Sequence, residues 1–273
     1  MNGRNPILIL VLGFLALTPP LAPAGASAAE EEVVKIPTRD GVTQSFVILR
    51  PAGTPAASVI LFAGGGGKLK IRNNGIRRMK NNFLVRTRRL FARQGFLVAV
   101  IDAPSDRQRE GLRDFRVGEE HAGDIAQVMA YLRQQAAAPV WLIGTSRGTL
   151  SAANGAARLQ QDGPAGIVLT SSVTRLSKRM ADSLRQVDLK AIRVPTLVVH
   201  HEDDDCYVTP YYDMEALMGW LENAPRKELL MFAGGKEPES NECQPLSPHG
   251  YFGIEDKVVA AIAAWIKKVN AGR

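Results

Sequence analysis

The chain has 273 residues, 45% of them apolar and 22% charged, and carries a formal net charge of +7 at pH 7. The apolar share is ordinary for a globular protein with a sizeable core, and the length excludes neither one domain nor two. The positive charge favours solubility and attracts anions, but by itself it is no evidence for a nucleic-acid partner.

The first residues have the features of a secretory signal peptide. A weakly positive start precedes an apolar run at residues 7–17, which is too short to span a bilayer. Two prolines end this run, and the Ala-Ser-Ala of residues 26–28 offers the small residues that a signal peptidase requires. We expect residues 1–28 to be removed and residues 29–273 to form one periplasmic or secreted domain without stable membrane insertion. The alternative is an uncleaved membrane anchor.

Apolar strands then alternate with amphipathic helices along the chain. Strands are predicted at residues 31–37, 43–49, 58–63, 96–101, 140–143, 166–170, 196–199 and 228–232. Helices are predicted in the second half of residues 68–93, at 119–135, after Gly148, at 211–221 and at 254–269. This alternation is typical of an α/β fold, in which a mostly parallel sheet carries helices on both faces. The first two strands are expected to form an antiparallel edge.

Two segments lack a clear pattern. Residues 105–118 mix both charges and are expected to be a loop with little fixed structure. Residues 173–190 are ambiguous and are interpreted as a partly helical excursion. Neither segment is long enough for a large lid, so the sequence favours an open site and a small or flexible substrate.

Residues 140–150 (VWLIGTSRGTL) are the most informative stretch of the chain. A short buried strand leads into Gly144-x-Ser146-x-Gly148, and a run rich in small residues follows. A strand, a sharp turn with serine at its apex and a helix together form a nucleophile elbow. The turn strains the serine backbone, and side chains two residues before and after it would collide. Because the motif alone occurs by chance, it is this context that makes Ser146 the candidate nucleophile.

A serine nucleophile needs a base, and the base needs an acid that orients it. Of the four histidines, His249 follows the last predicted strand. Sites in parallel sheets form beyond the carboxyl ends of the strands, and the order Ser, Asp, His also favours this residue. The acid is expected in the loop after residues 196–199, where spacing cannot choose among Asp203, Asp204 and Asp205.

Three stretches carry a resemblance to a known superfamily: GTSRG at 144–148, HHEDDDC at 200–206 and HGY at 249–251. Over essentially all of residues 29–273 the sequence resembles the α/β-hydrolase superfamily. Within it, the chain is similar to small exported bacterial hydrolases of the dienelactone-hydrolase-like kind. The resemblance implies a central sheet of about eight strands. It also implies Asp204 as the acid, with Asp205 second, because the family's acid loop reads His-x-x-Asp-x-Cys.

Two backbone N–H groups are expected to stabilise an oxyanion in such a site. One is that of Arg147, directly after the nucleophile. The other is assigned to Gly64, or Ala63 beside it, in a glycine run that follows the third predicted strand. The likeness to an HGGG loop is partial, because Ala63 stands where histidine would. A phosphate-binding loop is the alternative, but no Gly-Lys-Ser/Thr follows the run.

Cys206 and Cys243 are the only cysteines. An even number in an exported chain favours a disulfide, here one that would tie the acid loop to the base loop. The alternative is two free thiols.

Residues 68–93 hold ten basic residues and no acid. They form either a solvated face or, through Lys68, Lys70 and Arg72, a site of attraction for an anionic substrate or surface. No aromatic residues are interleaved in the manner of a single-strand nucleic-acid site, so no nucleic-acid partner is expected.

Together these features predict a serine hydrolase that cleaves an ester or related acyl bond of a small molecule through an acyl-enzyme. No metal and no organic cofactor is required by this chemistry. An acyltransferase or peptidase with the same triad, and a non-catalytic binding protein on a hydrolase scaffold, are the alternatives. The acyl group, the leaving group and the oligomeric state are left open.

Overall fold

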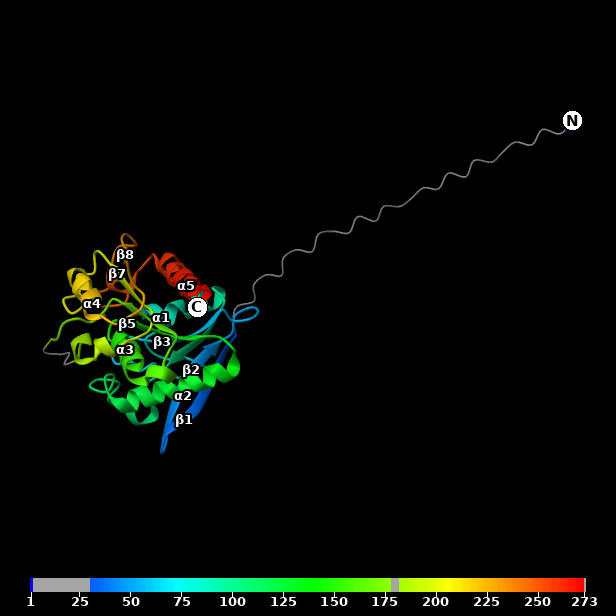
Figure 1. Cartoon of the computed structure of the whole chain (residues 1–273), viewed down its shortest axis with the longest axis horizontal. Coiled ribbons are helices and arrows are strands. Elements are labelled where there is room, and N and C mark those ends of the chain that lie inside the picture. Colours follow the sequence, from blue (N-terminus) through cyan, green and yellow to red (C-terminus); the bar gives the residue numbers. More distant parts are fainter. Residues whose placement is uncertain (2–29, 178–181, 273) are drawn as a thin grey trace.

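The computed structural model describes residues 1, 30–177 and 182–272, so the predicted signal peptide lies outside the described residues apart from Met1. In the described part of the chain eight strands form one sheet in the order β1-β2-β4-β3-β5-β6-β7-β8 (Figure 1). Their bounds are β1 (Glu31–Arg39), β2 (Val42–Leu49), β3 (Ala57–Phe62), β4 (Phe96–Ile101), β5 (Val140–Thr145), β6 (Gly166–Thr170), β7 (Thr196–His201) and β8 (Lys227–Phe232). The pairs β1–β2 and β2–β4 are antiparallel and the other pairs are parallel. The predicted mostly parallel sheet with an antiparallel edge is confirmed.

Helices cover both faces of this sheet. They are α1 (Phe83–Arg93), α2 (Glu119–Gln135), α3 (Gly148–Leu159), α4 (Met214–Trp220) and α5 (Glu255–Ala271). Because successive strand residues point to opposite faces, Ile60 and Phe62 of β3 lie on the face covered by α2 and α3, in a core cluster that extends to α4. Val59 and Leu61 of the same strand pack with α1 and α5, which lie side by side.

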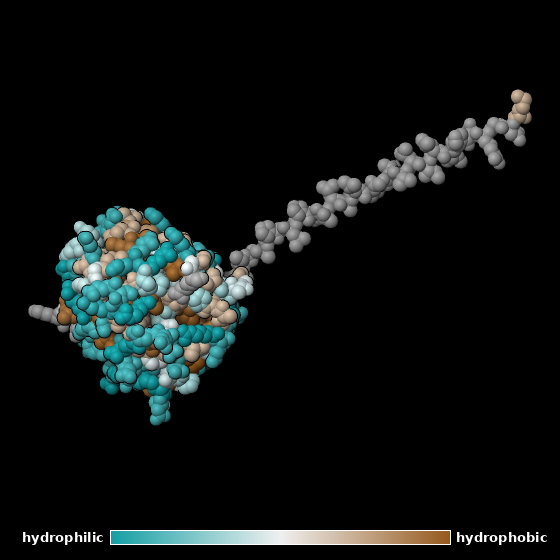
Figure 2. All heavy atoms as spheres, in the orientation of Figure 1, coloured by the Kyte–Doolittle hydropathy of each residue, from teal (hydrophilic) through white to brown (hydrophobic). Residues whose placement is uncertain are grey.

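No helix in the described ranges combines the length and the apolar character that crossing a membrane would require. Hydrophilic residues prevail on the face of the molecule seen in Figure 2, where apolar residues are scattered between them.

Residues 105–118 are better ordered than the sequence suggested, and that prediction was wrong. A 3-10 turn occupies Ser105–Arg107, and Leu112, Phe115 and Arg116 are buried. Leu112 and Phe115 pack with Ala103 in a small cluster of their own. This burial has no periodic pattern in the sequence, because a compact loop presents its apolar residues at irregular intervals.

The ambiguous stretch 173–190 contains no α-helix among its described residues. It forms a 3-10 turn at Leu184–Gln186, closed by a capping box between Ser183 and Gln186, and another turn spans Leu189–Ala191. Residues 178–181 are not described. The helix predicted at 211–221 also begins as a 3-10 turn, at Tyr211–Asp213, and becomes α-helical only at Met214.

The start of α3 lies unusually close to the sheet. A Cβ atom on Gly144 would overlap the carbonyl oxygen of Gly148, and one on Gly148 would overlap the carbonyl oxygen of Phe62. The two glycines of the elbow therefore let the first turn of α3 pack directly against the ends of β3 and β5. Their steric requirement, expected from the sequence, is met at both positions.

We predict that Gly148→Ala lowers the free energy of unfolding by about 1–3 kcal/mol, because the new methyl group would force backbone apart at the centre of the sheet. Urea unfolding followed by circular dichroism measures the change. Gly219→Ala is the matched control, since a Cβ at this position in α4 meets no atom within 4 Å. Alanine there should leave the stability unchanged or raise it by up to about 1 kcal/mol. Equal unfolding midpoints for the two variants would contradict the steric argument.

Candidate active site

Ser146 stands at the apex of the turn between β5 and α3. Its φ of 53° lies in the left-handed region, which a serine adopts only at a cost in conformational energy. The turn is held by a hydrogen bond from the N–H of Ser146 to the carbonyl oxygen of Thr170, at 2.9 Å. The strained backbone lifts the half-buried side chain into a cavity of about 230 Å³, which His249 and Gly64 also line.

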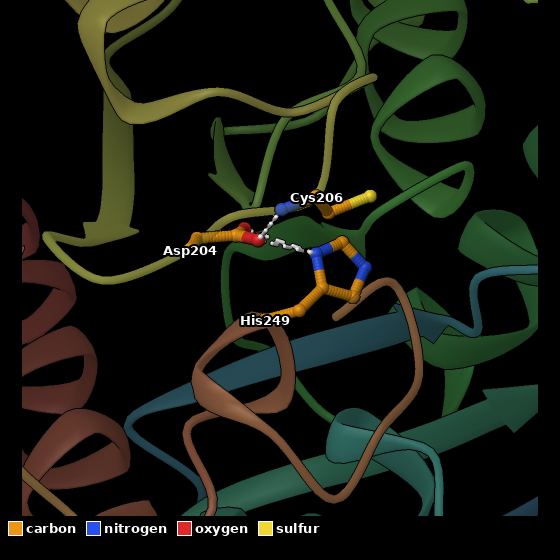
Figure 3. Close-up of side chains that lie close together, drawn as sticks. All are labelled: Asp204, Cys206 and His249. Atoms are coloured by element: carbon orange, nitrogen blue, oxygen red, sulfur yellow. Dashed lines mark hydrogen bonds and ion pairs between the residues drawn. The ribbon is translucent and has the colours of Figure 1, made fainter. Parts of the chain in front are cut away.

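A buried carboxylate–imidazole pair lies beside this cavity (Figure 3). Nδ1 of His249, in the 3-10 turn Pro248–Gly250, is 3.0 Å from Oδ2 of Asp204. His249 is 5% exposed and Asp204 is 2% exposed. By contrast, Asp203 and Asp205 are exposed to solvent. The structure thus places Asp204 against His249, and neither of its neighbours there.

Both oxygens of the Asp204 carboxylate have hydrogen-bond donors. Oδ1 accepts from the backbone N–H of Cys206 at 3.1 Å, and Oδ2 accepts from the hydroxyl of Thr209 at 3.1 Å. The same hydroxyl is 3.2 Å from Nδ1 of His249. Thr209 therefore spans the carboxylate–imidazole pair. Sequence reasoning missed Thr209, because nothing in the loop pattern separates it from other polar residues.

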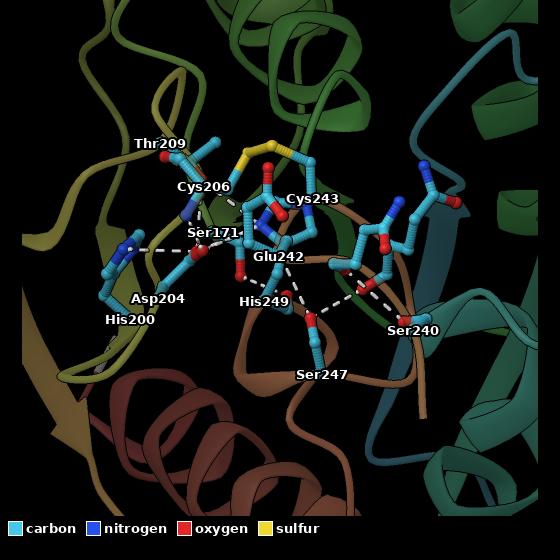
Figure 4. Close-up of a disulfide and its surroundings, with 12 residues drawn as sticks. Ser171, His200, Asp204, Cys206, Thr209, Ser240, Glu242, Cys243, Ser247 and His249 are labelled. Atoms are coloured by element: carbon cyan, nitrogen blue, oxygen red, sulfur yellow. Dashed lines mark hydrogen bonds and ion pairs between the residues drawn. A yellow bond between two sulfur atoms is a disulfide. The ribbon is translucent and has the colours of Figure 1, made fainter. Parts of the chain in front are cut away.

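The turn that carries His249 is tied to the sheet by Ser171 and Tyr251. The Ser171 hydroxyl donates to the carbonyl oxygen of His249 at 2.8 Å (Figure 4), and the Tyr251 hydroxyl donates to the carbonyl oxygen of Val199 at 2.9 Å. The N–H of Ser171 donates in turn to the Tyr251 hydroxyl at 3.1 Å. Burial raises the pKa of Tyr251, so the phenol stays neutral and available as a donor. These bonds hold the turn that carries His249 against the carboxyl ends of β6 and β7.

Cys206 and Cys243 form the expected disulfide, which joins the acid loop to the base loop (Figure 4). Asp204, Cys206 and His249 are also close enough together to suggest a metal site. Their donor chemistry does not fit one, because the sulfur of Cys206 is bonded to Cys243 and is no thiolate. Nδ1 of His249 is likewise directed at the carboxylate. The proximity of the three residues is explained by the hydrogen bond between Asp204 and His249 and by the disulfide.

A second histidine, His200, lies 3.5 Å from Oδ2 of Asp204 through its Nε2 atom. Burial lowers the pKa of His200 to about 4, although the charge of Asp204 opposes the shift. His200 is therefore neutral at neutral pH and does not compete with His249 as a cationic partner. It does not line the two cavities that Ser146 borders.

Ser146 lies between two cavities. The first, with His249, is lined in part by apolar side chains, including Met79, Phe83 and Pro245, and by Asn82. The second, of about 320 Å³, is more polar and is lined by residues that include Arg147, Tyr207, Asn241, Glu242 and Gln244. An elongated substrate can therefore place one group on either side of the serine. Asn82 had no signal in the sequence beyond its place before a predicted helix.

The proposed oxyanion residues flank the serine. A Cβ atom on Gly64 would lie 2.9 Å from Cβ of Ser146, so the glycine backbone passes directly beside this serine. Arg147 directly precedes the first residue of α3, where backbone N–H groups have no partner within the helix.

The basic residues singled out in the sequence lie elsewhere. Lys70 and Arg72 line other hollows, and Nζ of Lys68 donates to the carbonyl oxygen of Arg109. None of the three lines the two cavities that Ser146 borders.

No protein-family model matches the sequence, and no curated protein does. Solved structures do match the three-dimensional arrangement. A cold-adapted esterase from an Arctic intertidal metagenomic library has a TM-score of 0.59 at 16% identity, over 89% of this chain and 94% of its own. Dienelactone hydrolase from Anabaena variabilis gives 0.56 at 16% identity, over 88% and 96%. An esterase from Pyrococcus furiosus gives 0.61 at 13% identity, over 94% and 99%. The protein has the α/β-hydrolase fold. At such identities the likeness to these structures concerns the fold alone.

We predict that replacing both cysteines by alanine lowers the free energy of unfolding by about 3–4 kcal/mol. The disulfide joins residues 37 apart, and the chain-entropy model gives this value for a closed loop of that length. Urea unfolding of the oxidised protein, the reduced protein and the double variant measures it. Dithiothreitol should shift the midpoint of the wild type and leave that of the variant unchanged. A wild-type midpoint that stays fixed while two thiols become titratable would contradict the prediction.

The stability should also fall with acid below about pH 6.5. Burial lowers the pKa of His121 to about 3 and that of His200 to about 4, whereas unfolded histidine titrates near 6.5. Between these values the unfolded chain binds more protons than the folded one, so each histidine removes about 1.4 kcal/mol per pH unit. Urea unfolding at pH 7, 6 and 5 gives the slope. His121→Gln and His200→Gln should each reduce the slope by about 1.4 kcal/mol per pH unit, the contribution of one proton. An unchanged slope in both variants would refute this account.

Proposed function

We propose that the protein is an exported serine hydrolase that cleaves carboxylic esters through Ser146, His249 and Asp204. The observation that carries the proposal is the buried pair of His249 and Asp204, 3.0 Å apart, with the imidazole and Ser146 lining one cavity. A serine on a strained turn and an imidazole oriented by a carboxylate are the parts that acyl transfer requires.

The chemistry follows from the orientation of the imidazole. The carboxylate of Asp204 accepts a hydrogen bond from Nδ1–H of His249, which leaves Nε2 as the base for the hydroxyl of Ser146. As the serine oxygen attacks the ester carbonyl, His249 takes its proton, and the carboxylate stabilises the imidazolium. His249 then gives the proton to the departing alkoxide, and an alcohol leaves. Water attacks the acyl-enzyme by the same steps in reverse and releases the acid.

The negative charge of the tetrahedral intermediate needs donors that are already in place. We assign this role to the backbone N–H groups of Arg147 and Gly64. The position of Arg147 at the start of α3 supports the first, since a helix N-terminus carries partial positive charge. The passage of Gly64 beside Ser146 supports the second.

The substrate class rests on the two cavities. Their sizes, about 230 and 320 Å³, suit a small ester with one modest group on each side of the carbonyl. The esterases and the dienelactone hydrolase among the structures of similar fold support ester hydrolysis over other acyl chemistry. Export is supported by the apolar run at residues 7–17 and by the disulfide, which persists in oxidising compartments.

We predict that Ser146→Ala abolishes labelling by a fluorophosphonate probe and lowers kcat for p-nitrophenyl acetate by at least about 10⁴-fold. Asp204→Asn should lower kcat by about 10⁴-fold with little change in KM, because the imidazole loses its orienting charge. Asp205→Asn is the matched control. This neighbouring carboxylate is exposed, so its loss should change kcat by less than about threefold.

Two outcomes would separate the alternatives. If the folded wild type neither reacts with the probe nor hydrolyses esters, the protein is a binding module on a hydrolase scaffold. If Asp205→Asn and not Asp204→Asn removes activity, the acid is assigned wrongly.

A further inference from the structure

Arg116 is a fully buried cation whose role is not explained by the triad. It is 2% exposed, and no carboxylate within the described ranges lies within ion-pair distance of it. Burial, and then the charge of Arg147, lower the pKa of Arg116 to about 9, so the guanidinium stays protonated at neutral pH. The charge of Asp182 opposes this shift but forms no ion pair with Arg116, so the contacts that hold the buried cation call for an explanation.

Those contacts are made with the glycine loop beside Ser146. Nη2 of Arg116 donates to the carbonyl oxygen of Ala63 at 2.9 Å, to that of Gly65 at 3.3 Å and to that of Gly64 at 3.4 Å. A single nitrogen thus donates to three successive carbonyl oxygens, which all face Arg116. A Cβ on Gly67 would lie 2.8 Å from the same nitrogen, so glycine is required for the guanidinium to come this close.

The other end of the guanidinium is anchored in α3. Nη1 donates to the hydroxyl oxygen of Ser151 at 2.7 Å, and this hydroxyl lies 2.9 Å from Nε2 of His121. Arginine has no acceptor atom, so the Ser151 hydroxyl accepts from Arg116 and donates its own hydrogen bond to Nε2 of His121. Burial lowers the pKa of His121 to about 3, and the neutral ring is able to accept it. Arg116 is therefore fixed from both sides.

The direction of the carbonyl groups determines the direction of the N–H groups. In a planar trans peptide, C=O and the following N–H point to opposite sides. Since the carbonyls of Ala63 and Gly64 point inward to Arg116, the N–H groups of Gly64 and Gly65 point away from it. Both glycines line the cavity with Ser146 and His249, and Gly64 passes beside the serine. Successive N–H groups aimed at one concavity make an anion site.

We propose that Arg116 is a positioning residue that holds the glycine loop in the orientation required to stabilise the oxyanion. This inference rests on the proposed ester hydrolysis and deepens it. Arg116 does not touch the substrate. It turns the carbonyls of residues 63–65 away from the cavity, and its charge polarises the same peptide groups so that their N–H ends bind negative charge more strongly.

The test compares Arg116→Met and Arg116→Lys with the wild-type chain. With p-nitrophenyl acetate, Arg116→Met should lower kcat by about 10²-fold, the usual effect of losing an oxyanion donor, while KM changes by less than about threefold. An alkyl trifluoromethyl ketone, which forms an oxyanion on the serine, should lose affinity by a similar factor. The matching secondary alcohol, which forms none, should bind as before. Arg116→Lys keeps the charge but only part of the donor geometry. Its kcat and its affinity for the ketone should lie between those of the wild type and those of Arg116→Met.

Arg133→Met is the matched control. Arg133 also donates to backbone carbonyl oxygens, those of Asp162 and Gly163, but it does not line either cavity that Ser146 borders. It should leave every value at the wild-type level. Unchanged kcat in Arg116→Met overturns the proposal, and so does a lower kcat with unchanged affinity for the ketone.

If Arg116→Met does not fold, Arg116→Lys decides: parallel losses in kcat and ketone affinity support the proposal, and losses in KM or alcohol affinity alone overturn it. If the wild type hydrolyses no ester and binds no ketone, the proposed function fails. Amide hydrogen exchange of residues 63–67 then tests the positioning role, which requires faster exchange in Arg116→Lys than in Arg133→Met and is overturned by equal rates.

Discussion

The contact between the first turn of α3 and the backbone of β3 is the constraint on which the rest of the site depends. Gly148 lies against the carbonyl of Phe62 so closely that no side chain fits between them. Ser146, two residues before Gly148, adopts a left-handed conformation. The contact of Gly148 with Phe62 also places the loop that leaves β3 beside the serine, so one close contact positions both Ser146 and the glycine loop. A larger gap between α3 and the sheet would separate them.

The charge of Asp204 is the second constraint on the site, because it acts on side chains that the packing has brought together. Asp204 lies between two imidazoles, His249 at 3.0 Å and His200 at 3.5 Å. If both were protonated, the carboxylate would have its charge divided between them. Burial lowers the pKa of His200 to about 4 and leaves it neutral, so the charge of Asp204 acts on His249. The neutral ring of His200 thus leaves the carboxylate of Asp204 to pair with His249.

Much of this was predictable from the sequence, and the physical reason differs from residue to residue. Strands such as residues 96–101 are continuous apolar runs because both faces of a parallel sheet are covered. Ser146 was predictable because the glycines around it are a local steric requirement. Asp204 was not separable from its neighbours by spacing, since a one-residue shift in a loop has no periodic signature. It was selected only through the resemblance to other acid loops.

The residues that sequence reasoning missed are those defined by partners far along the chain. Arg116 lies in a segment of mixed charge, and its three carbonyl partners are about fifty residues away. The basic stretch 68–93 showed no acid of its own, yet Arg86 pairs with Glu255 and Arg88 pairs with Glu31. Long-range partners of this kind leave no trace in local composition. A charge in the sequence therefore predicts neither a solvated face nor a ligand site until its partners are known.

The same long-range ties explain how a site built on loops can be rigid. Each functional group follows a different strand, and the strand alone would leave its loop free to move. The base loop is held by Ser171 and by the disulfide, and the glycine loop is held by Arg116. In each case the restraint comes from a neighbouring loop or helix and not from the strand that carries the group. The positions of these loops are therefore set by contacts between segments that lie far apart in the sequence.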